Sequence, residues 1–474
     1  MRRPSSTPRT KYRILLSLIL LAGCSIPLPL IDRIKSAGEL IVVTRNSGTT
    51  LYEGPKSLTG FEHDLVQLFA KELGVKPHFI IPKHFEDLLP MVINGKAHLA
   101  AAGLTVTPDR VSEIRFGPSY QEITQQIIYR RGNQRPHKIE DLIGGKLAII
   151  AGSSHEEELL RLKTQYPALN WESRSDLESA ELMQMVQNRE IDYTIADSND
   201  FAVNRRFMPH LGMAFNLTEP QHLAWAMAFA EDSSLYDAME GFFKRIREDG
   251  TLDQLIERHY GHIGRLNFVE LQTFVKHFKN RLPKYEALFK EAESKTSIDW
   301  RTLAAIGYQE SHWNPRAKSP TGVRGIMMLT QTTAKQMKIK SRIDPHQSII
   351  GGARYLRYIE DKLPERIPEP DRLWLTLAGY NVGFGHLEDA RKLTEHLGGD
   401  PDKWVDVKQH LPKLSLKKWY SGLKHGYARG SEPVNYVDNI RAYYELLRWQ
   451  LRKLAQEGQG NTPSHALSII PKAL

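Results

Sequence analysis

The sequence predicts an α/β domain followed by an all-α domain, and two observations lead to this fold class. From Leu40 to about residue 262, short apolar segments alternate with amphipathic helical segments, a pattern that indicates an α/β domain with mostly parallel sheets. From Asn267 to about residue 455, strand patterns nearly vanish and helical periodicity dominates. A chain of 474 residues is long enough for both domains.

The composition narrows the class of protein. Hydrophobic residues make up 41% of the chain and charged residues 25%, which is typical of globular proteins. The net charge of +9 suits an anionic polymer or a membrane surface, but the basic residues are dispersed. The sequence contains neither zinc-finger spacing nor an RNA-binding aromatic motif. We therefore expect no nucleic acid partner, no metal and no other cofactor.

The N-terminus has the pattern of an export signal. Residues 1–13 carry five positive charges and no acid, and residues 14–23 are an apolar run too short to span a bilayer. The run ends in Leu21-Ala22-Gly23-Cys24, which resembles the lipobox of bacterial lipoproteins. This resemblance implies a signal peptide over 1–23, an acylated Cys24 and a tether over 24–31.

Cys24 is the only cysteine of the chain, so the exported protein has no disulfide framework. A cysteine buried by chance is the alternative. Ser25 follows the cysteine. By resemblance to lipoprotein sorting, this serine favours the periplasmic face of the outer membrane, with peripheral attachment as the other option.

The first domain is predicted in order from its local patterns. Phe61, Leu65, Leu68 and Phe69 recur at helical spacing before Gly74, which indicates a helix with a glycine stop. Further helices are expected over 84–96 and 153–162. Strands are expected over 39–44, 78–82, 97–104, 125–132, 144–152, 191–197 and 222–229.

Several of these stretches resemble the bacterial periplasmic solute-binding proteins that capture amino acids. The stretches occur in the order found in that family and cover most of 39–260. They are GFEHDLVQLFAKELGV, INGKAHLAAAGLTVTPDR, IRFGPSYQE, GGKLAIIAGSSHEEEL and IADS. The resemblance implies two α/β lobes that are joined by a hinge and close on a ligand.

Five residues match ligand-binding positions of that family. Arg110 is suited to fork a ligand carboxylate, with the Thr105 hydroxyl beside it and Ser154 opening a helix in the second lobe. Asp197 is suited to meet an α-ammonium group, and Phe61 to wall the pocket. The alternatives are a solvated Arg110, an Asp197 that caps a helix, and a domain of this fold that binds no ligand.

The second domain, 267–455, is predicted to be helical throughout, and the polar tail over 456–474 to be disordered. Helices are expected over 268–282, 285–295, 297–311, 332–339, 348–363, 373–381 and 435–454.

One of these helices directs a carboxylate along its apolar face. With Ser297 as the expected N-cap, Leu303, Ile306, Gly307 and Glu310 fall at i, i+3, i+4 and i+7. Burial raises the pKa of a carboxyl group, and a raised pKa suits a general acid near neutral pH. The alternative is that the helix has ended and Glu310 lies in solvent.

The residues after Glu310 resemble the Slt-type lytic transglycosylases, which have a lysozyme-like helical fold within the α+β superfamily. The order of the two domains resembles the membrane-bound lytic transglycosylase F family. The matching motifs are Glu310-Ser311, Trp313-Asn314-Pro315, Gly325-Ile326-Met327-Met328, the glycine pair 351–352, Tyr380-Asn381, and Glu432 with Tyr436-Val437.

The resemblance implies that Glu310 cleaves the MurNAc–GlcNAc bond of peptidoglycan and leaves a 1,6-anhydro-MurNAc end. Between Glu310 and Tyr355 the only other acid is Asp344, whereas ordinary glycoside hydrolysis uses two acids. A single carboxylate makes intramolecular attack by the C6 hydroxyl reasonable.

By the same resemblance, Ser319, Tyr380, Asn381 and Tyr436 contact substrate. A buried, satisfied amide at Asn381 and a core tyrosine at Tyr436 are the alternatives. The chain departs from the common motifs at Met328, where glutamine is usual, and at Gly379, where alanine is usual.

The expected function is therefore that of an exported murein lytic transglycosylase. Its solute-binding-like domain, 32–266, would modulate the catalytic domain by binding an amino-acid-like or muropeptide ligand. Two alternatives stay open. One is a muropeptide receptor with a silent, murein-binding helical domain, and the other is a muramidase in which water attacks C1.

Overall fold

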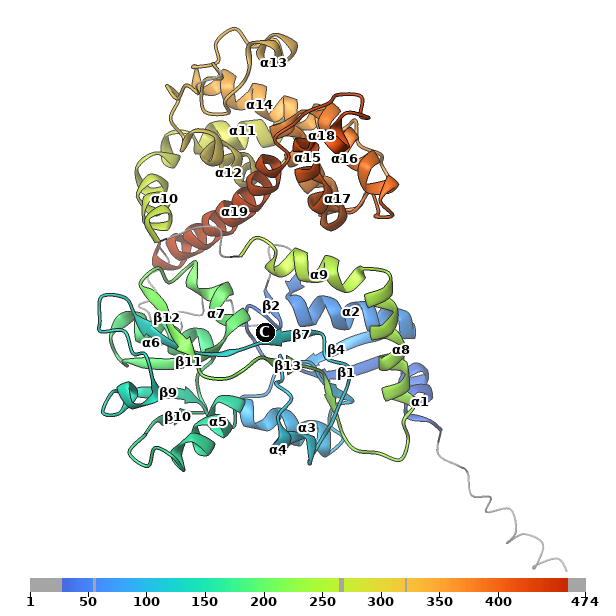
Figure 1. The fold of residues 1–474 in the computed structure, drawn as a ribbon, viewed down its shortest axis with the longest axis vertical. Coiled ribbons are helices and arrows are strands. Elements are labelled where there is room, and N and C mark those ends of the chain that lie inside the picture. Colours follow the sequence, from blue (N-terminus) through green and yellow to red (C-terminus); the bar gives the residue numbers. More distant parts are fainter. Residues whose placement is uncertain (1–27, 54–56, 264–267, 320–321, 459–474) are drawn as a thin grey trace, which may run out of the picture.

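In the computed structural model, the described residues are 28–53, 57–263, 268–319 and 322–458. The signal peptide expected over 1–23, Cys24 and residues 459–474 of the expected tail lie outside them. A two-lobed α/β domain carries a helical domain on one side (Figure 1). This arrangement confirms the predicted fold class. In the described part of the chain, no helix has both the length and the apolar character needed to cross a bilayer.

The first lobe is a five-stranded sheet in the order β4-β1-β5-β14-β6, covered by helices. Most of the lobe is built before residue 120, and β14, α8 and α9 return to it later. Its elements are α1 (Leu30–Ala37), β1 (Glu39–Val43), β2 (Tyr52–Glu53), β3 (Leu58–Thr59), α2 (Phe61–Leu73), β4 (Lys76–Ile80), α3 (Leu88–Ile93), β5 (Leu99–Ala100), α4 (Pro108–Val111), β6 (Arg115–Phe116), β14 (Ala226–Met227), α8 (Ser234–Glu248) and α9 (Thr251–Tyr260).

The second lobe is a sheet in the order β10-β9-β11-β8-β12, and a two-stranded ribbon, β7 with β13, joins the lobes. Figure 1 shows this ribbon between the two sheets. The elements are β7 (Gln121–Ile123), β8 (Gln125–Arg130), β9 (Leu147–Ile150), α5 (Ser154–Lys163), β10 (Glu172–Arg174), α6 (Ser179–Asn188), β11 (Tyr193–Asp197), α7 (Ser198–Arg205), β12 (Leu211–Asn216) and β13 (Gln221–Leu223).

The sheets are mixed, which corrects the expectation of mostly parallel pairing. Strand β1 pairs in parallel with β4 and β5, and β9 pairs in parallel with β10 and β11. The strands that arrive over the ribbon, β8 and β14, run antiparallel to their neighbours. The physical reason is the double crossing between lobes, because a strand that enters from the other lobe need not follow a βαβ crossover.

The helical domain follows α9 and has one buried core of its own. In its described residues the extended segments are isolated bridges beside Arg324. Its helices are α10 (Phe268–Asn280), α11 (Glu286–Thr296), α12 (Trp300–Ser311), α13 (Gln331–Gln336), α14 (Pro345–Glu360), α15 (Asp371–Val382), α16 (Phe384–His396), α17 (Trp404–His410), α18 (Lys417–Tyr420) and α19 (Ser431–Gly458).

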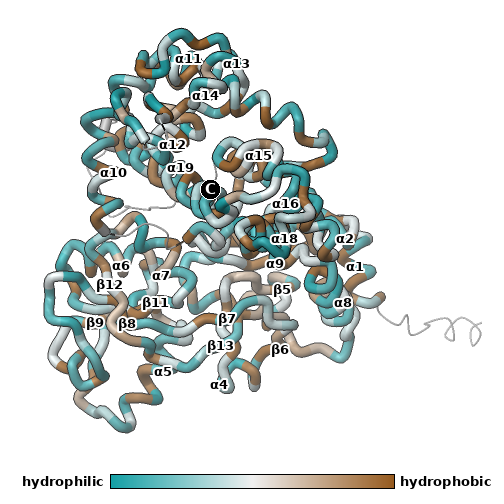
Figure 2. Tube along the Cα trace, turned by 45° about the horizontal axis from the view of Figure 1, so that its top comes forward, coloured by the Kyte–Doolittle hydropathy of each residue, from teal (hydrophilic) through white to brown (hydrophobic). Residues whose placement is uncertain are grey.

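Apolar burial holds each part together. Figure 2 shows brown, hydrophobic stretches among the strands of both lobes. The two lobes and the helical domain have separate buried clusters. Among the residues placed in these clusters, Phe207 is the only lobe residue that packs against the core of the helical domain. It lies just beyond α7. Polar contacts therefore make up much of the junction between the domains.

Candidate active site and interlobe binding site

Helix α12 places Glu310 in its last turn. Asp299 is the N-cap, and its side chain accepts a hydrogen bond from the backbone N–H of Arg301. The expected N-cap, Ser297, instead ends α11 with a left-handed φ of 58°, so that prediction is wrong. The helix continues to Ser311 and Glu310 is only partly exposed. The alternative of a helix that ends before Glu310 is therefore excluded.

The electrostatics of Glu310 are simple. The Tyr436 hydroxyl donates a hydrogen bond of 2.6 Å to Glu310 Oε1. Burial raises the pKa of Glu310 to about 7, and the hydrogen bond from Tyr436 opposes this rise. Within the described residues, no second carboxylate contributes to this shift. Near neutral pH the group is therefore available both as an acid and as a base.

Two tyrosines from different helices meet beside Glu310. Tyr436, on α19, and Tyr380, on α15, stack with ring centroids 6.4 Å apart. The Tyr380 hydroxyl donates to the carbonyl oxygen of Met327 at 3.0 Å. Tyr436 is buried, as the core alternative required, yet its hydroxyl reaches the carboxylate. The structure thus brings Glu310, Tyr436 and Tyr380 together.

The loop after α12 is tied to the helices around it. Ser311 Oγ donates to the carbonyl of Ile326 at 2.8 Å. Trp313 is buried and its indole N–H donates to the carbonyl of Ala304 at 2.8 Å, so this tryptophan packs inside the domain. Gly325 has a φ of 90°, and a Cβ there would lie 1.8 Å from the carbonyl oxygen of Arg342. The motif glycine is therefore required by close backbone approach.

The two remaining predicted substrate contacts lie on the loop after α12 and on α15, the helix that also carries Tyr380. Ser319 Oγ accepts from the Val323 N–H at 3.2 Å within the loop. Asn381 is exposed near the end of α15, which excludes the alternative of a buried amide. Met328, the residue in place of the usual glutamine, is partly exposed with a φ of 45°.

Asp344, the other acid near the motif, has a structural role. It is the N-cap of α14, and its carboxylate accepts from the backbone N–H of Gln347 at 2.8 Å. A carboxylate engaged at a helix N-terminus is stabilised where it lies. It does not supply a second acid beside Glu310.

Four of the five residues predicted for the first domain lie between the lobes. Ser154 Oγ donates to Thr105 Oγ1 at 3.3 Å, across the two lobes. Asp197 Oδ1 lies 3.0 Å from Nε2 of His155. It occupies the N-cap position of α7, but its side chain does not cap that helix. Arg110 is buried, not solvated.

The Arg110 guanidinium already has protein partners. Its Nε donates to Glu157 Oε1 at 2.7 Å, and its Nη2 donates to the carbonyl of Gly152 at 3.1 Å. Glu157, on α5, also accepts from Thr107. A ligand carboxylate at Arg110 would have to displace Glu157. Phe61, the fifth predicted residue, is fully buried and packs with Tyr120, His259 and Tyr260.

Sequence reasoning missed a buried charged group beside these residues. Arg45 follows β1 and lies 3.9 Å from both Glu178 and Asp200 of the other lobe. Burial raises the pKa of Glu178 to about 7 and also raises the pKa of Asp200. The position of Arg45 after a parallel strand was the available signal, since ligands of open α/β sheets bind at the carboxyl ends of strands.

Metal-binding geometry is lacking in the part of the chain that the structure describes, where no cluster of three or more His, Cys, Asp or Glu side chains is arranged to hold an ion.

Comparison with known proteins matches both domains. The family described as bacterial extracellular solute-binding proteins, family 3, matches residues 40–262, and the transglycosylase SLT domain matches residues 287–402. A protein of Saccharophagus degradans named membrane-bound lytic murein transglycosylase F is 49% identical over 432 residues, which are 90% of this chain and 86% of that protein. Its namesakes from Ectopseudomonas mendocina and Pseudomonas syringae pv. tomato are 48% and 46% identical, and the alignments cover 91% and 94% of this chain and 89% and 90% of theirs.

A two-lobed solute-binding fold joined to an Slt-type helical domain defines a class, the lytic transglycosylases with an N-terminal binding domain. Within that class, the relatives that align over nearly the whole chain identify the family. This protein belongs to the membrane-bound lytic murein transglycosylase F family.

Proposed function

We propose that Glu310 is the single acid–base of a non-hydrolytic cleavage of peptidoglycan. The observation that carries this proposal is its carboxyl group, with a pKa raised to about 7 and the Tyr436 hydroxyl as partner. A group that titrates near the working pH is suited to give and then take a proton. The family membership supports murein as the substrate.

The reaction needs no water. Glu310 gives its proton to the glycosidic oxygen as the bond from that oxygen to C1 of MurNAc breaks. The Glu310 carboxylate then takes the proton of the MurNAc C6 hydroxyl while its oxygen bonds to C1. This step closes the 1,6-anhydro ring and returns Glu310 to its acid form. Because attack is intramolecular, orientation replaces a positioned water.

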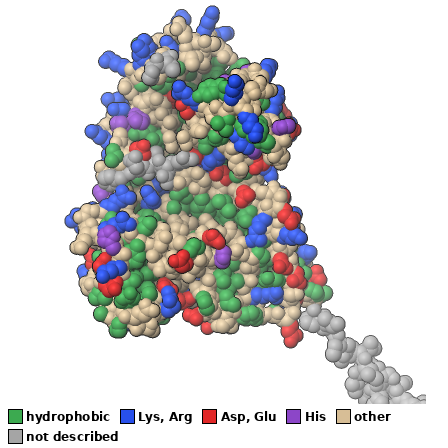
Figure 3. Space-filling model, viewed as in Figure 1, with side chains coloured by type: hydrophobic (Ala, Val, Ile, Leu, Met, Phe, Trp, Pro, Cys, Tyr) green, Lys and Arg blue, Asp and Glu red, His purple; other side chains and the backbone are tan. Residues whose placement is uncertain are grey.

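Ser319, Tyr380, Asn381 and Tyr436 are the residues that we propose to position the glycan. Their support differs from one residue to the next. Tyr436 and Tyr380 adjoin Glu310 or its loop, and Asn381 is exposed. On the face drawn in Figure 3, Lys and Arg side chains stand out over the helical domain, which supports contact with an anionic polymer.

A digest of purified sacculi tests the proposal. Wild-type protein is expected to release anhydro-muropeptides by mass spectrometry, and Glu310→Gln to release none. The variant should fold at least as well above pH 7. A carboxyl whose folded pKa is raised destabilises the protein once it ionises, and the substitution removes this cost. Reducing ends would indicate the hydrolase, and no release by either protein would favour the receptor.

We also propose that a ligand between the lobes modulates the enzyme. Glu157 holds Arg110 where a ligand carboxylate would bind, and three acids, Glu178, Asp197 and Asp200, face Arg45 and His155. This surplus of acid favours a ligand that also carries an ammonium group, as an amino acid or a stem peptide does.

Calorimetry with stem peptides and their amino acids tests this modulation, with murein digestion measured in the same samples. Glu157→Gln is expected to bind ligand more tightly than wild type, because the competing carboxylate is lost. The absence of binding in both proteins, or binding that leaves turnover unchanged, would exclude modulation by such ligands.

Finally, we propose an envelope location on the periplasmic face of the outer membrane, through acylation of Cys24. The support is the lipobox-like sequence and the membrane-bound name of the relatives. Labelling with a palmitate analogue is expected in wild type and not in Cys24→Ser. Label retained in the variant would contradict acylation at this residue, and label absent from both would favour peripheral attachment.

A further inference from the structure

A pocket lies where three parts of the molecule meet. Tyr52 comes from the first lobe, and α19 closes the pocket from the helical domain. The second lobe contributes the end of α7 and the residues just after it, namely Val203, Asn204, Arg206 and Phe207. On α19, Glu445, Arg448, Trp449 and Arg452 follow one another at helical spacing and share one face. The pocket therefore belongs to the junction between the domains.

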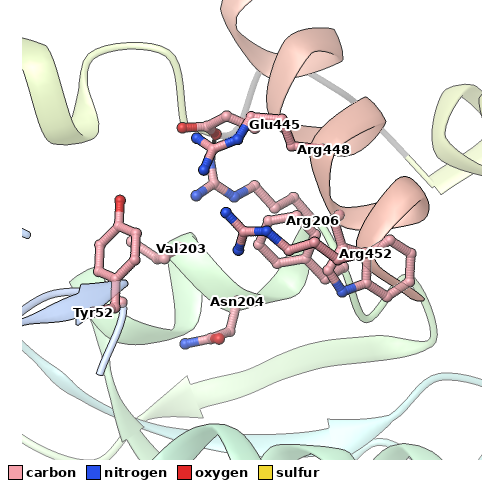
Figure 4. A pocket seen from close by; sticks show the side chains of 10 residues that line it. Tyr52, Val203, Asn204, Arg206, Glu445, Arg448 and Arg452 are labelled. Atoms are coloured by element: carbon pink, nitrogen blue, oxygen red, sulfur yellow. Dashed lines mark hydrogen bonds and ion pairs between the residues drawn. The ribbon is translucent and has the colours of Figure 1, made fainter. Parts of the chain in front are cut away.

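The charges of this pocket do not balance. Three guanidinium groups line it, those of Arg206, Arg448 and Arg452, and Glu445 is the one carboxylate among its described lining residues. Figure 4 shows these arginines together with Glu445, and Tyr52 across the opening from them. The lining therefore carries an excess of two positive charges.

The single carboxylate is already engaged. Glu445 Oε2 accepts from Nη1 of Arg206 and lies 2.8 Å from Nε2 of His262. Burial lowers the pKa of His262 well below its usual value, so this histidine adds no charge. Glu53 and Arg301 act on Arg452 through space, but neither lines the pocket. One carboxylate does not offset the charges of Arg206, Arg448 and Arg452 together.

Two of the guanidinium groups have nitrogen atoms without partners. Nε of Arg206 and Nη2 of Arg448 are buried and make no hydrogen bond with the described residues. Burial lowers the pKa of Arg206 to about 10 and also lowers those of Arg448 and Arg452. Buried donors without acceptors are costly, so an acceptor that enters the pocket would relieve an existing penalty.

The space and the walls limit what can enter. The cavity measures about 60 Å³, which corresponds to about four to six water molecules. This volume has room for one small oxyanion. Phe207 and Trp449 pack with ring centroids 5.5 Å apart, and Arg206 lies over Phe207 at 4.8 Å. The aromatic rings thus fix the arginines around a small polar space.

We infer that this junction is a binding site for a dianionic phosphate group, held by Arg448, Arg452 and the free edge of Arg206. A dianion matches the excess of two positive charges, whereas a carboxylate would leave one uncompensated. Guanidinium groups bind phosphate oxygens through paired hydrogen bonds. Because its ligands come from α7 and α19, a bound phosphate would join the second lobe to the helical domain.

Titration calorimetry of the full-length protein with inorganic phosphate, at constant ionic strength, tests the inference. Saturable binding at one site is expected, with no equivalent response to chloride. Arg448→Gln is expected to weaken binding about 10- to 100-fold, the effect of losing charge-assisted hydrogen bonds. Arg366→Gln, which removes an exposed arginine paired with Asp402 elsewhere in the helical domain, is the matched control and should bind as wild type does.

Two further variants guard against a folding artefact. Glu445→Gln removes the competing carboxylate and is expected to tighten phosphate binding, a gain that misfolding cannot produce. Arg448→Lys keeps the charge but loses the fork, and is expected to weaken binding less than Arg448→Gln. Acetate that binds as tightly as phosphate would overturn the dianion, and equal affinities in wild type and Arg448→Gln would overturn the site.

Two probes distinguish the possible sources of the phosphate group. Glycerol 3-phosphate binding in the calorimeter would indicate a soluble phosphate monoester. Arginine-dependent binding to vesicles with phosphatidic acid, but not with phosphatidylcholine alone, would indicate a lipid headgroup. Hydrogen exchange over α7 and α19 is expected to slow with either ligand. Unchanged exchange at saturating phosphate would contradict the bridging role.

Discussion

At the scale of single residues, Glu310 depends on two opposed effects. Burial at the end of α12 favours its neutral form, and the hydroxyl of Tyr436 favours its charged form. Because burial has the larger effect, the pKa rises to about 7. The balance leaves both protonation states populated at the pH of the envelope, as a residue that must act as acid and then as base requires.

Tyr436→Phe is predicted to extend activity to higher pH while lowering the maximum rate. The hydrogen bond holds the pKa of Glu310 down, so its loss raises that pKa by about one unit or more. The acid form then persists to higher pH, and the alkaline limb of kcat/KM moves up. The measurement is a pH profile of anhydro-muropeptide release.

Tyr380→Phe is the control for this prediction. Its hydroxyl donates to the Met327 carbonyl and not to Glu310. The alkaline limb is expected to stay where it is in the wild type. A limb that shifts equally in both variants, or moves to lower pH in Tyr436→Phe, would contradict the role given to the Tyr436 hydrogen bond.

Single residues also show where sequence reasoning stops. Glu310 is predictable because helical periodicity places it on an apolar face and because the motifs after it resemble the Slt type, and both are local properties of the sequence. Glu157 was not found as the partner of Arg110, because the pair joins two lobes that local patterns cannot bring together. For Arg45, the only signal in the sequence is its position after a strand. The structure adds that its partners, Glu178 and Asp200, lie more than 130 residues away.

At the scale of elements, helix periods were predicted well and helix ends less well. Ser297 and Asp299 are both good N-cap residues two positions apart, and the apolar pattern alone does not choose between them. Likewise, alternation predicted the strands of both lobes but not their mixed pairing. Pairing direction depends on the route of the chain over the β7–β13 ribbon, which local patterns do not record.

The glycine pair on α14 sets how closely the motif loop packs. A Cβ at Gly352 would lie 2.7 Å from Cβ of Met327, so α14 and the loop approach more closely than any larger residue allows. Since the Met327 carbonyl accepts from Tyr380, displacement of Met327 would disturb the tyrosines beside Glu310. The pair therefore supports the site through packing.

Gly352→Ala is predicted to destabilise the protein by about 1–3 kcal/mol through overpacking and to lower activity. Denaturant unfolding and sacculus digestion measure the two effects. Gly241→Ala is the matched control, because a Cβ at this exposed position in α8 meets nothing within 4 Å. It should stabilise by about 0.5–1 kcal/mol. Equal effects of the two substitutions would refute the packing argument.

At the scale of the whole molecule, the first lobe and the helical domain meet through a compact charged network. Glu257, on α9, lies 3.1 Å from Lys408 of α17 and 2.7 Å from Arg441 of α19. Asp438, fully buried, lies near the same two cations. Contacts of this kind are invisible in the sequence, which predicted both domains but not how they dock.

Glu257→Gln is predicted to loosen this docking. Of the carboxylates paired with Lys408 and Arg441 among the described residues, only Asp438 would remain, and breaking a buried pair costs up to about 3–5 kcal/mol. Scanning calorimetry is expected to show the single transition broaden or split as the domains unfold separately. Glu72→Gln, which breaks an exposed pair with Arg245 inside the first lobe, should change stability by less than about 1 kcal/mol. Similar traces for both variants would argue against Glu257 as a docking residue.

One rod of backbone, α19, serves three tasks along its length. It presents Tyr436 to Glu310, Arg441 to α9, and Arg448 with Arg452 to α7. Each residue turns a helix by about 100°. The three contacts therefore depend on the directions in which these side chains project from the helix axis. Inserting one residue after Ala442 would leave the helix intact but rotate its later face away from α7. Inserting seven would nearly restore the angle, yet would lengthen the rod by about 10 Å. Neither insertion is therefore compatible with all three contacts, and the length of α19 is as constrained as its composition.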